Sequence, residues 1–224
     1  FTNLTIPGTL STIGNNVFEG CTQLTNLTFN PSSTNEALTL GFNAGSTDTS
    51  VDAEGPFYDT ALTKLTLNRQ INYPFNNWQI ISSSDGAFSV SQIGSLKEIT
   101  LGDQVTTLTG CMFARAGIKS INLNKVTKIE EGAFCNTSIE SITIPGTVES
   151  VELNAFWGCE SLSTIDIQDG TKTLNFGAQF YQNHYGPFYD SPLTDIYLGR
   201  EINYTGYYIS AYTPSSWKAG FFAT

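Results

Sequence analysis

The sequence predicts a repeat solenoid built mostly from strand and irregular structure, with one short parallel strand and a short helical turn in each repeat. Three observations support this: an apolar opening residue, an apolar-x-apolar triplet three residues after it, and a phenylalanine later in the unit. The unit recurs eight times, with openers at Phe1, Leu24, Leu62, Leu96, Ile118, Ile139, Leu162 and Leu193.

The triplets are the expected strands. Side chains alternate between two faces along a strand, so the two apolar residues of a triplet point inward and the middle one points outward. Eight stacked parallel strands would therefore display one line of residues on their outer face: Thr5, Thr28, Thr66, Thr100, Asn122, Thr143, Asp166 and Tyr197.

The second half of each unit contains the aromatic anchor. A helical turn around it would press the ring against neighbouring units and build a continuous aromatic column. An apolar pair between triplet and anchor, such as Val126 with Ile129, predicts a second short extended segment. The anchors are Phe18, Phe57, Phe88, Phe113, Phe134, Phe156, Phe188 and Phe222.

A longer period lies over the short one. The run 5–21 matches 143–159, and the run 55–73 matches 186–204, so units one to three are duplicated as units six to eight. We expect a single domain over 1–224, with both ends trimmed from a longer protein. Its units are 1–23, 24–61, 62–95, 96–117, 118–138, 139–161, 162–192 and 193–224, and insertions fall at about 34–55, 72–86, 171–186 and 203–219.

Composition argues against several classes of partner. The net charge is −10, and the ten Lys and Arg residues are dispersed, so no basic face offers itself to nucleic acid or to anionic lipid. No apolar run is long enough to cross a membrane. The four cysteines lack metal-ligand spacing, and we interpret them as buried thiols, with a Cys135–Cys159 bridge as the alternative.

The chain lacks a recognisable catalytic motif. Its single histidine, His184, lies in an insertion, and no serine or cysteine stands in a nucleophile context, so we predict a protein that is not an enzyme and uses no cofactor. The acidic loop 48–54 offers oxygen ligands for calcium, but it lacks the EF-hand spacing. We interpret it as a solvated loop and predict no metal site.

Aromatic residues in two insertions suggest another kind of surface. Flat rings among Asn and Ser residues suit sugar binding, although such rings also cover exposed flanks of a core. The candidate glycan-binding residues are Tyr73, Trp78, Tyr204, Tyr207, Tyr208 and Trp217.

The run from Ile142 to Val148, followed by Val151, Phe156 and Cys159, resembles the repeat of the BspA-like leucine-rich-repeat family. The resemblance covers nearly the whole chain and implies a right-handed leucine-rich-repeat superhelix. It also implies a cell-surface or secreted protein, an association with adhesion, and no catalytic residue.

We therefore expect a non-catalytic binding scaffold that recognises a host or microbial surface protein through the strand face. Carbohydrate binding through the aromatic insertions and a purely structural spacer are the alternatives. The residues expected to contact a protein partner are Lys64, Thr66, Lys97, Thr100, Lys119, Asn122, Glu140, Thr143, Asp166, Asp195 and Tyr197.

Overall fold

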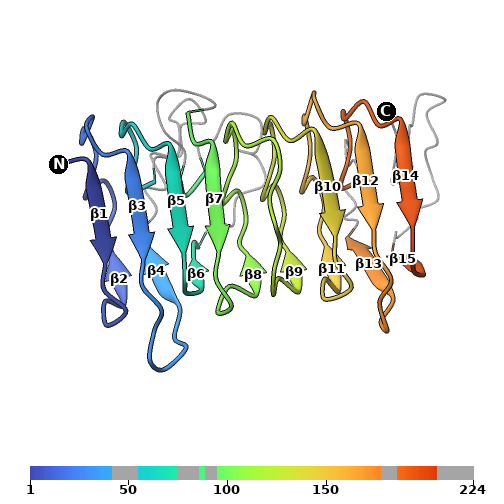
Figure 1. Ribbon diagram of the computed structural model, residues 1–224, viewed down its shortest axis with the longest axis horizontal. Coiled ribbons are helices and arrows are strands. Elements are labelled where there is room, and N and C mark those ends of the chain that lie inside the picture. Colours follow the sequence, from blue (N-terminus) through green and yellow to red (C-terminus); the bar gives the residue numbers. More distant parts are fainter. Residues whose placement is uncertain (42–54, 75–85, 89–94, 178–185, 206–224) are drawn as a thin grey trace, which may run out of the picture.

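Parallel strands stack in two layers along the chain, and this arrangement confirms the predicted solenoid (Figure 1). The computed structural model describes residues 1–41, 55–74, 86–88, 95–177 and 186–205. None of these residues forms a helix.

The first layer contains the predicted triplets. Paired strands match triplet to triplet, as in Leu27 opposite Leu65 and Thr28 opposite Thr66, so the apolar positions form rows inside and the middle positions form a row outside. One sheet has the order β1 (Asn3–Ile6), β3 (Asn26–Phe29), β5 (Lys64–Leu67) and β7 (Glu98–Leu101). A second has the order β10 (Ser141–Ile144), β12 (Thr164–Ile167) and β14 (Asp195–Leu198).

The fifth triplet, residues 121–123, is not a strand, and the prediction of eight strands is wrong at this unit. In most other units the backbone N–H after the strand donates to the last carbonyl of the preceding strand. Here the backbone N–H of Asn124 instead donates to Asn122 Oδ1 at 2.9 Å, while the Asn124 side chain donates to the Leu101 carbonyl at 3.1 Å. Local side-chain hydrogen bonds have replaced the ladder and divide the first layer into two sheets.

The second layer arises from the apolar pairs. One sheet of this layer has the order β2 (Thr12–Ile13), β4 (Leu38–Leu40) and β6 (Ile71–Asn72). The other has the order β8 (Thr107–Leu108), β9 (Lys128–Ile129), β11 (Ser150–Val151), β13 (Leu174–Gly177) and β15 (Ile202–Thr205). The Gln70 side chain links β6 to β8, because its amide donates to the Thr107 carbonyl at 2.7 Å and accepts from the N–H groups of Thr106 and Thr107 at 3.0 Å. The two sheets are therefore joined through a side chain.

The aromatic anchors form the predicted column between the layers. Consecutive rings from Phe18 to Phe188 have centroid separations of 5.1 to 6.2 Å, and most pairs are stacked. All except Phe18 are buried. The eighth anchor, Phe222, lies outside the described residues.

The segments that carry the anchors are turns, not helices. Around Phe18, Phe113, Phe134 and Phe156, the residues two positions before and two positions after the ring both have a positive φ, a conformation that interrupts a right-handed helix; around Phe57 and Phe188 only the residue two positions after has it. Phe156 lies between Asn154 at 55° and Gly158 at 65°, and Phe113 lies between Cys111 at 52° and Arg115 at 63°.

The cysteines are free thiols, so the alternative of a Cys135–Cys159 bridge is wrong. Cys111, Cys135 and Cys159 are buried, as predicted, and Cys21 is half-buried. The Cys159 thiol donates to the Phe134 carbonyl at 3.1 Å and pairs with the Thr137 hydroxyl at 3.2 Å.

Two arginines at matching positions of the duplicated blocks fasten the turn after the first strand of each block. Arg69, which is only 2% exposed, donates to the carbonyls of Gly8, Leu10 and Glu36 at 2.8 to 2.9 Å. Arg200 donates to the carbonyls of Gly146 and Pro145 at 3.1 and 3.0 Å. Each guanidinium thus reaches across an entire unit, from the third to the first unit of its block.

Candidate functional site

The candidate site is the outward side of the first layer, which we call the strand face. It comprises the outward side chains of the first and third residues of β1, β3, β5, β7, β10, β12 and β14, with Ser120 and Asn122 from the fifth unit and the residues directly before each strand. These side chains are exposed or half-buried, and most are Thr, Ser or Asn. The predicted line of outward residues is therefore present, and β7 and β10 border the interruption at Asn122.

A carbonyl just before each strand organises this surface. The Thr2 carbonyl accepts from the N–H groups of Thr25 and Asn26 at 2.9 and 3.0 Å and from the Thr25 hydroxyl at 3.1 Å. The same three hydrogen bonds recur at the Thr25 carbonyl, which accepts from the N–H groups of Thr63 and Lys64 and from the Thr63 hydroxyl. The hydroxyl groups of Thr25 and Thr63 thus help to tie β1 to β3 and β3 to β5 and to fix the spacing of the outward side chains there.

Two ion pairs cross between units on the strand face. On neighbouring strands, Lys64 Nζ lies 2.9 Å from Glu98 Oε2. In the next pair, Lys119 Nζ lies 2.6 Å from Glu140 Oε1. The hydrogen bond to Glu140 and the negative charge of its carboxylate raise the pKa of Lys119. Both pairs are largely exposed, so they orient side chains more than they stabilise the fold.

The predicted partner-binding residues divide into two groups along the strand face. The central group surrounds the two ion pairs and includes Lys97, Thr100, Asn122 and Thr143. The second group lies at β12 and β14, where Asp166 is directly opposite Tyr197 and Asp195 precedes Tyr197 by two residues on the same side. Lys64 on β5 and Asp195 on β14 are separated by β7, the fifth unit, β10 and β12, so they cannot contact one small ligand together (Figure 1).

The end group borders a hollow. A cavity of about 750 Å³, open to solvent, is lined by Asp166, Ile167, Gln168, Asp169, Ile196, Tyr197, Leu198 and Gly199. Tyr197 is 60% exposed, and Leu198 beside it is 58% exposed. The outward triplet pattern predicted Asp166 and Tyr197, but it gave no signal for the hollow.

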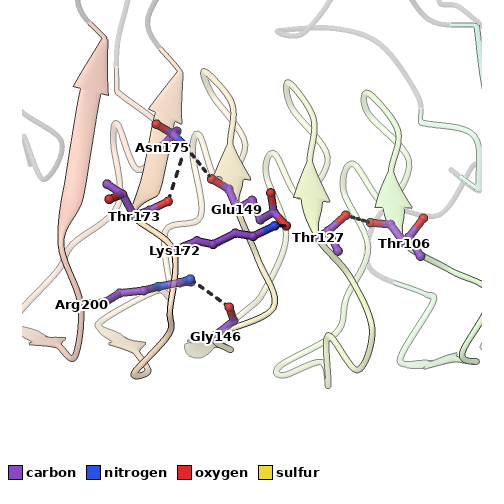
Figure 2. Close-up of polar contacts among 8 residues, drawn as sticks. All are labelled: Thr106, Thr127, Gly146, Glu149, Lys172, Thr173, Asn175 and Arg200. Carbon is purple, nitrogen blue, oxygen red and sulfur yellow. Dashed lines mark hydrogen bonds and ion pairs between the residues drawn. The ribbon is translucent and has the colours of Figure 1, made fainter.

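The opposite side of the solenoid carries a second polar network that the sequence analysis missed (Figure 2). Asn175 on β13 donates to the Glu149 carbonyl at 3.1 Å, and Asn203 on β15 donates to Asn175 Oδ1 at 3.0 Å. Lys172 reaches back to pair with the Glu149 carboxylate. These groups mainly satisfy one another across neighbouring units; the apolar pairs that predicted the second layer would have indicated their outward position.

The chemistry of the described residues is that of a polar surface. No cluster of three or more His, Cys, Asp or Glu side chains suited to a metal ion occurs in the part of the chain that the structure describes. Burial raises the pKa of the Cys159 thiol to about 12, which suppresses the nucleophilic thiolate. Among the same residues no helix has the length and apolar character needed to cross a bilayer.

The glycan-binding candidates lie largely elsewhere. Tyr73 is 2% exposed and packs in the core, so its predicted role on a sugar-binding surface is wrong. Its position after β6 places the ring between the layers, where it buries apolar area. Tyr204 belongs to β15. Trp78, Tyr207, Tyr208 and Trp217 lie outside the described residues, as do His184 and the acidic loop 48–54.

Comparison with known proteins identifies the repeat. A family model described as the BspA type leucine rich repeat region matches in six copies, over residues 1–44, 53–185 and 83–214. No curated protein and no solved structure matches the chain.

Proposed function

Because the chain belongs to the BspA-type leucine-rich-repeat family, we propose that it is a non-catalytic scaffold that binds a protein partner through its strand face. The family supports a repeat-based interaction scaffold, and its members are typically surface-associated or secreted and generally not enzymes. We place this scaffold at the cell surface or outside the cell, with adhesion to a host or microbial surface protein as its role.

One observation carries the proposal. The strand face keeps a row of exposed or half-buried polar side chains over seven strands, and the strand register fixes their spacing. Threonine and asparagine groups on a rigid, regularly spaced backbone can form many hydrogen bonds with a partner at a small cost in conformational entropy. On the opposite side, Asn175, Asn203 and Lys172 are bound to their neighbours.

The charges on this face would decide which partner binds. Lys64, Lys119 and their acidic partners already neutralise one another, whereas Lys97 takes part in none of the ion pairs found among the described residues. Charged groups of this kind add specificity and association rate more than affinity. Lys97, Lys119 and Tyr197 are therefore the residues whose replacement should be most informative.

The test is a binding screen with matched variants. Chain 1–224 is immobilised and exposed to a panel of purified extracellular-matrix and microbial surface proteins. For each protein that binds, Lys97→Ala/Lys119→Ala/Tyr197→Ala is compared with Lys128→Ala/Lys172→Ala/Asn203→Ala, which removes the same number of positive charges from the opposite side. Loss of at least tenfold in affinity in the first variant, with less than twofold in the second, supports the proposal.

Equal losses in the two variants would place the contact elsewhere and overturn the strand-face assignment. Binding to no protein on the panel, together with saturable binding of a glycan, would favour the carbohydrate alternative. Binding to neither class would favour a spacer.

A further inference from the structure

The strand face is asymmetric in charge, and its end group differs from its centre. In the centre, Lys64 and Lys119 are each paired with a carboxylate from a neighbouring unit. At the end, none of the ion pairs among the described residues involves Asp166, Asp169 or Asp195. Three carboxylates thus lie along β12 and β14 and the turn after β12, and within the described ranges none of them has an ion-pair partner.

The cation nearest in the sequence does not compensate them. Arg200 follows β14 by two residues, but its two terminal nitrogens donate to the backbone carbonyls of Gly146 and Pro145. Asp195 accepts a hydrogen bond from the Thr194 hydroxyl at 2.8 Å, which orients its carboxylate without neutralising it. Among the residues that the structure describes, these carboxylates are therefore not paired with a cationic side chain.

An exposed aromatic ring lies within this acidic group. Tyr197 occupies an outward position that is threonine in most of the other strands, and it is 60% exposed. It lies opposite Asp166 and two residues after Asp195. A ring bordered by carboxylates attracts a cation, since the ring face and the carboxylates are both negative.

The hollow provides the space that such a contact requires. Asp166, Asp169 and Gln168 line its polar part, and Tyr197 lines it together with the apolar Ile196 and Leu198. A guanidinium group matches this mixture, because its edge donates to carboxylates while its flat face lies on an aromatic ring.

We propose that the β12–β14 end of the strand face binds an extended, arginine-containing segment of the partner protein. The guanidinium of one arginine lies on Tyr197 between Asp166 and Asp195, and a second arginine reaches Asp169. Asp169 follows the end of β12 and lies three residues after Asp166, a separation of about 10 Å along the strand at roughly 3.3 Å per residue. Arginines two to three positions apart in an extended chain span this distance. The inference rests on the proposed function and specifies the chemistry of its partner.

The probe is a short peptide, Gly-Arg-Gly-Arg-Gly-Arg-Gly, titrated into chain 1–224 by calorimetry at low and physiological salt. We expect saturable binding with a stoichiometry near one. Asp166→Asn/Asp195→Asn should weaken it at least tenfold. Tyr197→Leu should weaken it about threefold, whereas Tyr197→Phe, which keeps the ring, should stay within twofold of the parent protein.

The matched control separates a site from general attraction to an acidic protein. Glu19→Gln/Glu160→Gln removes the same two charges from exposed positions off the strand face and should change the affinity less than twofold. Equal weakening by the two double variants would overturn the inference, as would absence of saturable binding. Saturation by a neutral glycan, abolished by Tyr197→Leu while the peptide fails to bind, would also overturn it and identify the hollow as a sugar site.

The two proposals fail in different ways. If a protein partner loses affinity in Lys97→Ala/Lys119→Ala/Tyr197→Ala but is insensitive to Asp166→Asn/Asp195→Asn, the strand-face function stands and the arginine site is wrong. If the peptide binds as expected while no protein on the panel binds to the strand face, the acidic site stands and the proposed function fails.

Discussion

The two duplicated blocks, residues 1–95 and 139–224, share an arginine at matching positions, but the two arginines differ in burial and in their number of hydrogen bonds. In the first block Arg69 is 2% exposed and makes three hydrogen bonds to backbone carbonyls. In the second block the matching Arg200 is half-buried and makes two. The comparison shows that a repeated sequence specifies a repeated contact, while the strength of that contact depends on how the block is covered.

The neighbouring strands account for part of the difference. β5, which precedes Arg69, has β3 on one side and β7 on the other, whereas β14, which precedes Arg200, is bonded to β12 alone among the described strands. Burial lowers the pKa of both arginines, and the carboxylate of Glu36 partly offsets this for Arg69. The three hydrogen bonds of the Arg69 guanidinium offset the free-energy cost of removing its charge from water.

Replacement of the two arginines should give the largest difference between the blocks. Arg69→Ala removes a side chain that is only 2% exposed and leaves three carbonyls without their donor, and we expect it to lower the free energy of unfolding by about 3 kcal/mol or more. Arg200→Ala should cost about 1 to 2 kcal/mol, because its side chain is only half-buried and makes one hydrogen bond fewer. Urea unfolding of both variants, followed by far-ultraviolet circular dichroism, measures the difference.

Lys125→Ala, at an exposed position in the central units, serves as the control and should change the free energy of unfolding by less than about 0.5 kcal/mol. Equal losses for Arg69→Ala and Arg200→Ala would show that burial does not distinguish the blocks and would remove the basis of the comparison.

A second difference between the blocks lies beside each arginine, where Gln70 in the first block corresponds to Glu201 in the second. Gln70 joins the two sheets of the second layer by donating to one Thr107 backbone group and accepting from another. Gln70→Glu keeps the acceptor but places a carboxylate against the Thr107 carbonyl, 2.7 Å away. We expect a loss of about 1 to 2 kcal/mol in unfolding free energy.

The junction itself should also loosen. Amide hydrogen exchange of Thr107 and Leu108 should accelerate in Gln70→Glu, while the strands of the first layer should keep their protection. The reverse exchange, Glu201→Gln, supplies the control, since it swaps the same two groups in the opposite direction at a position where no such bridge between sheets is found among the described residues. Unchanged protection at Thr107 would mean that the backbone alone holds the two sheets together.

The features that repeat could be predicted from the sequence, and the features that occur once or twice could not. Triplets and apolar pairs predicted both strand layers, because side-chain alternation along a strand is a local property. The break at the fifth unit depends on two asparagine side chains that compete with the backbone, and its only local signal was asparagine at both positions 122 and 124. Arg69 acts on carbonyls some sixty residues away, which no local pattern shows, although the matched arginines beside Ile71-Asn72 and Ile202-Asn203 gave a usable sign.

The candidate site divides in the same way. The outward row, including Thr100, Thr143 and Tyr197, followed directly from the triplets. The hollow beside Tyr197 depends on how two neighbouring strands end, and the burial of Tyr73 depends on packing between layers. Both are tertiary properties that composition and spacing do not contain.

The smallest expected effect concerns how the second block meets the units before it. Asn16 in the first block donates to Glu19 within its own unit, whereas the matching Asn154 is reached by Glu131 from the preceding unit. Burial raises the pKa of Glu131, the hydrogen bond with Asn154 partly offsets this, and the charge of Glu152 adds to it. Since the folded protein then holds this proton more tightly than the unfolded chain, the contribution of Glu131 to stability falls as pH rises from its ordinary pKa of 4.5 through the raised value.

Glu131→Gln should therefore stabilise the protein at pH 7, by less than about 1 kcal/mol because the group is partly exposed, and the gain should shrink towards pH 4. Chemical unfolding at both pH values measures it, with the exposed Glu160→Gln as a control for net charge. A gain that is the same at pH 4 and pH 7 would show that the carboxylate is not desolvated at this contact. A destabilisation at pH 7 would mean that the hydrogen bond with Asn154 stabilises the ionised Glu131 carboxylate by more than its burial costs. The contact between Glu131 and Asn154 would then be a specific polar contact like those made by Arg69.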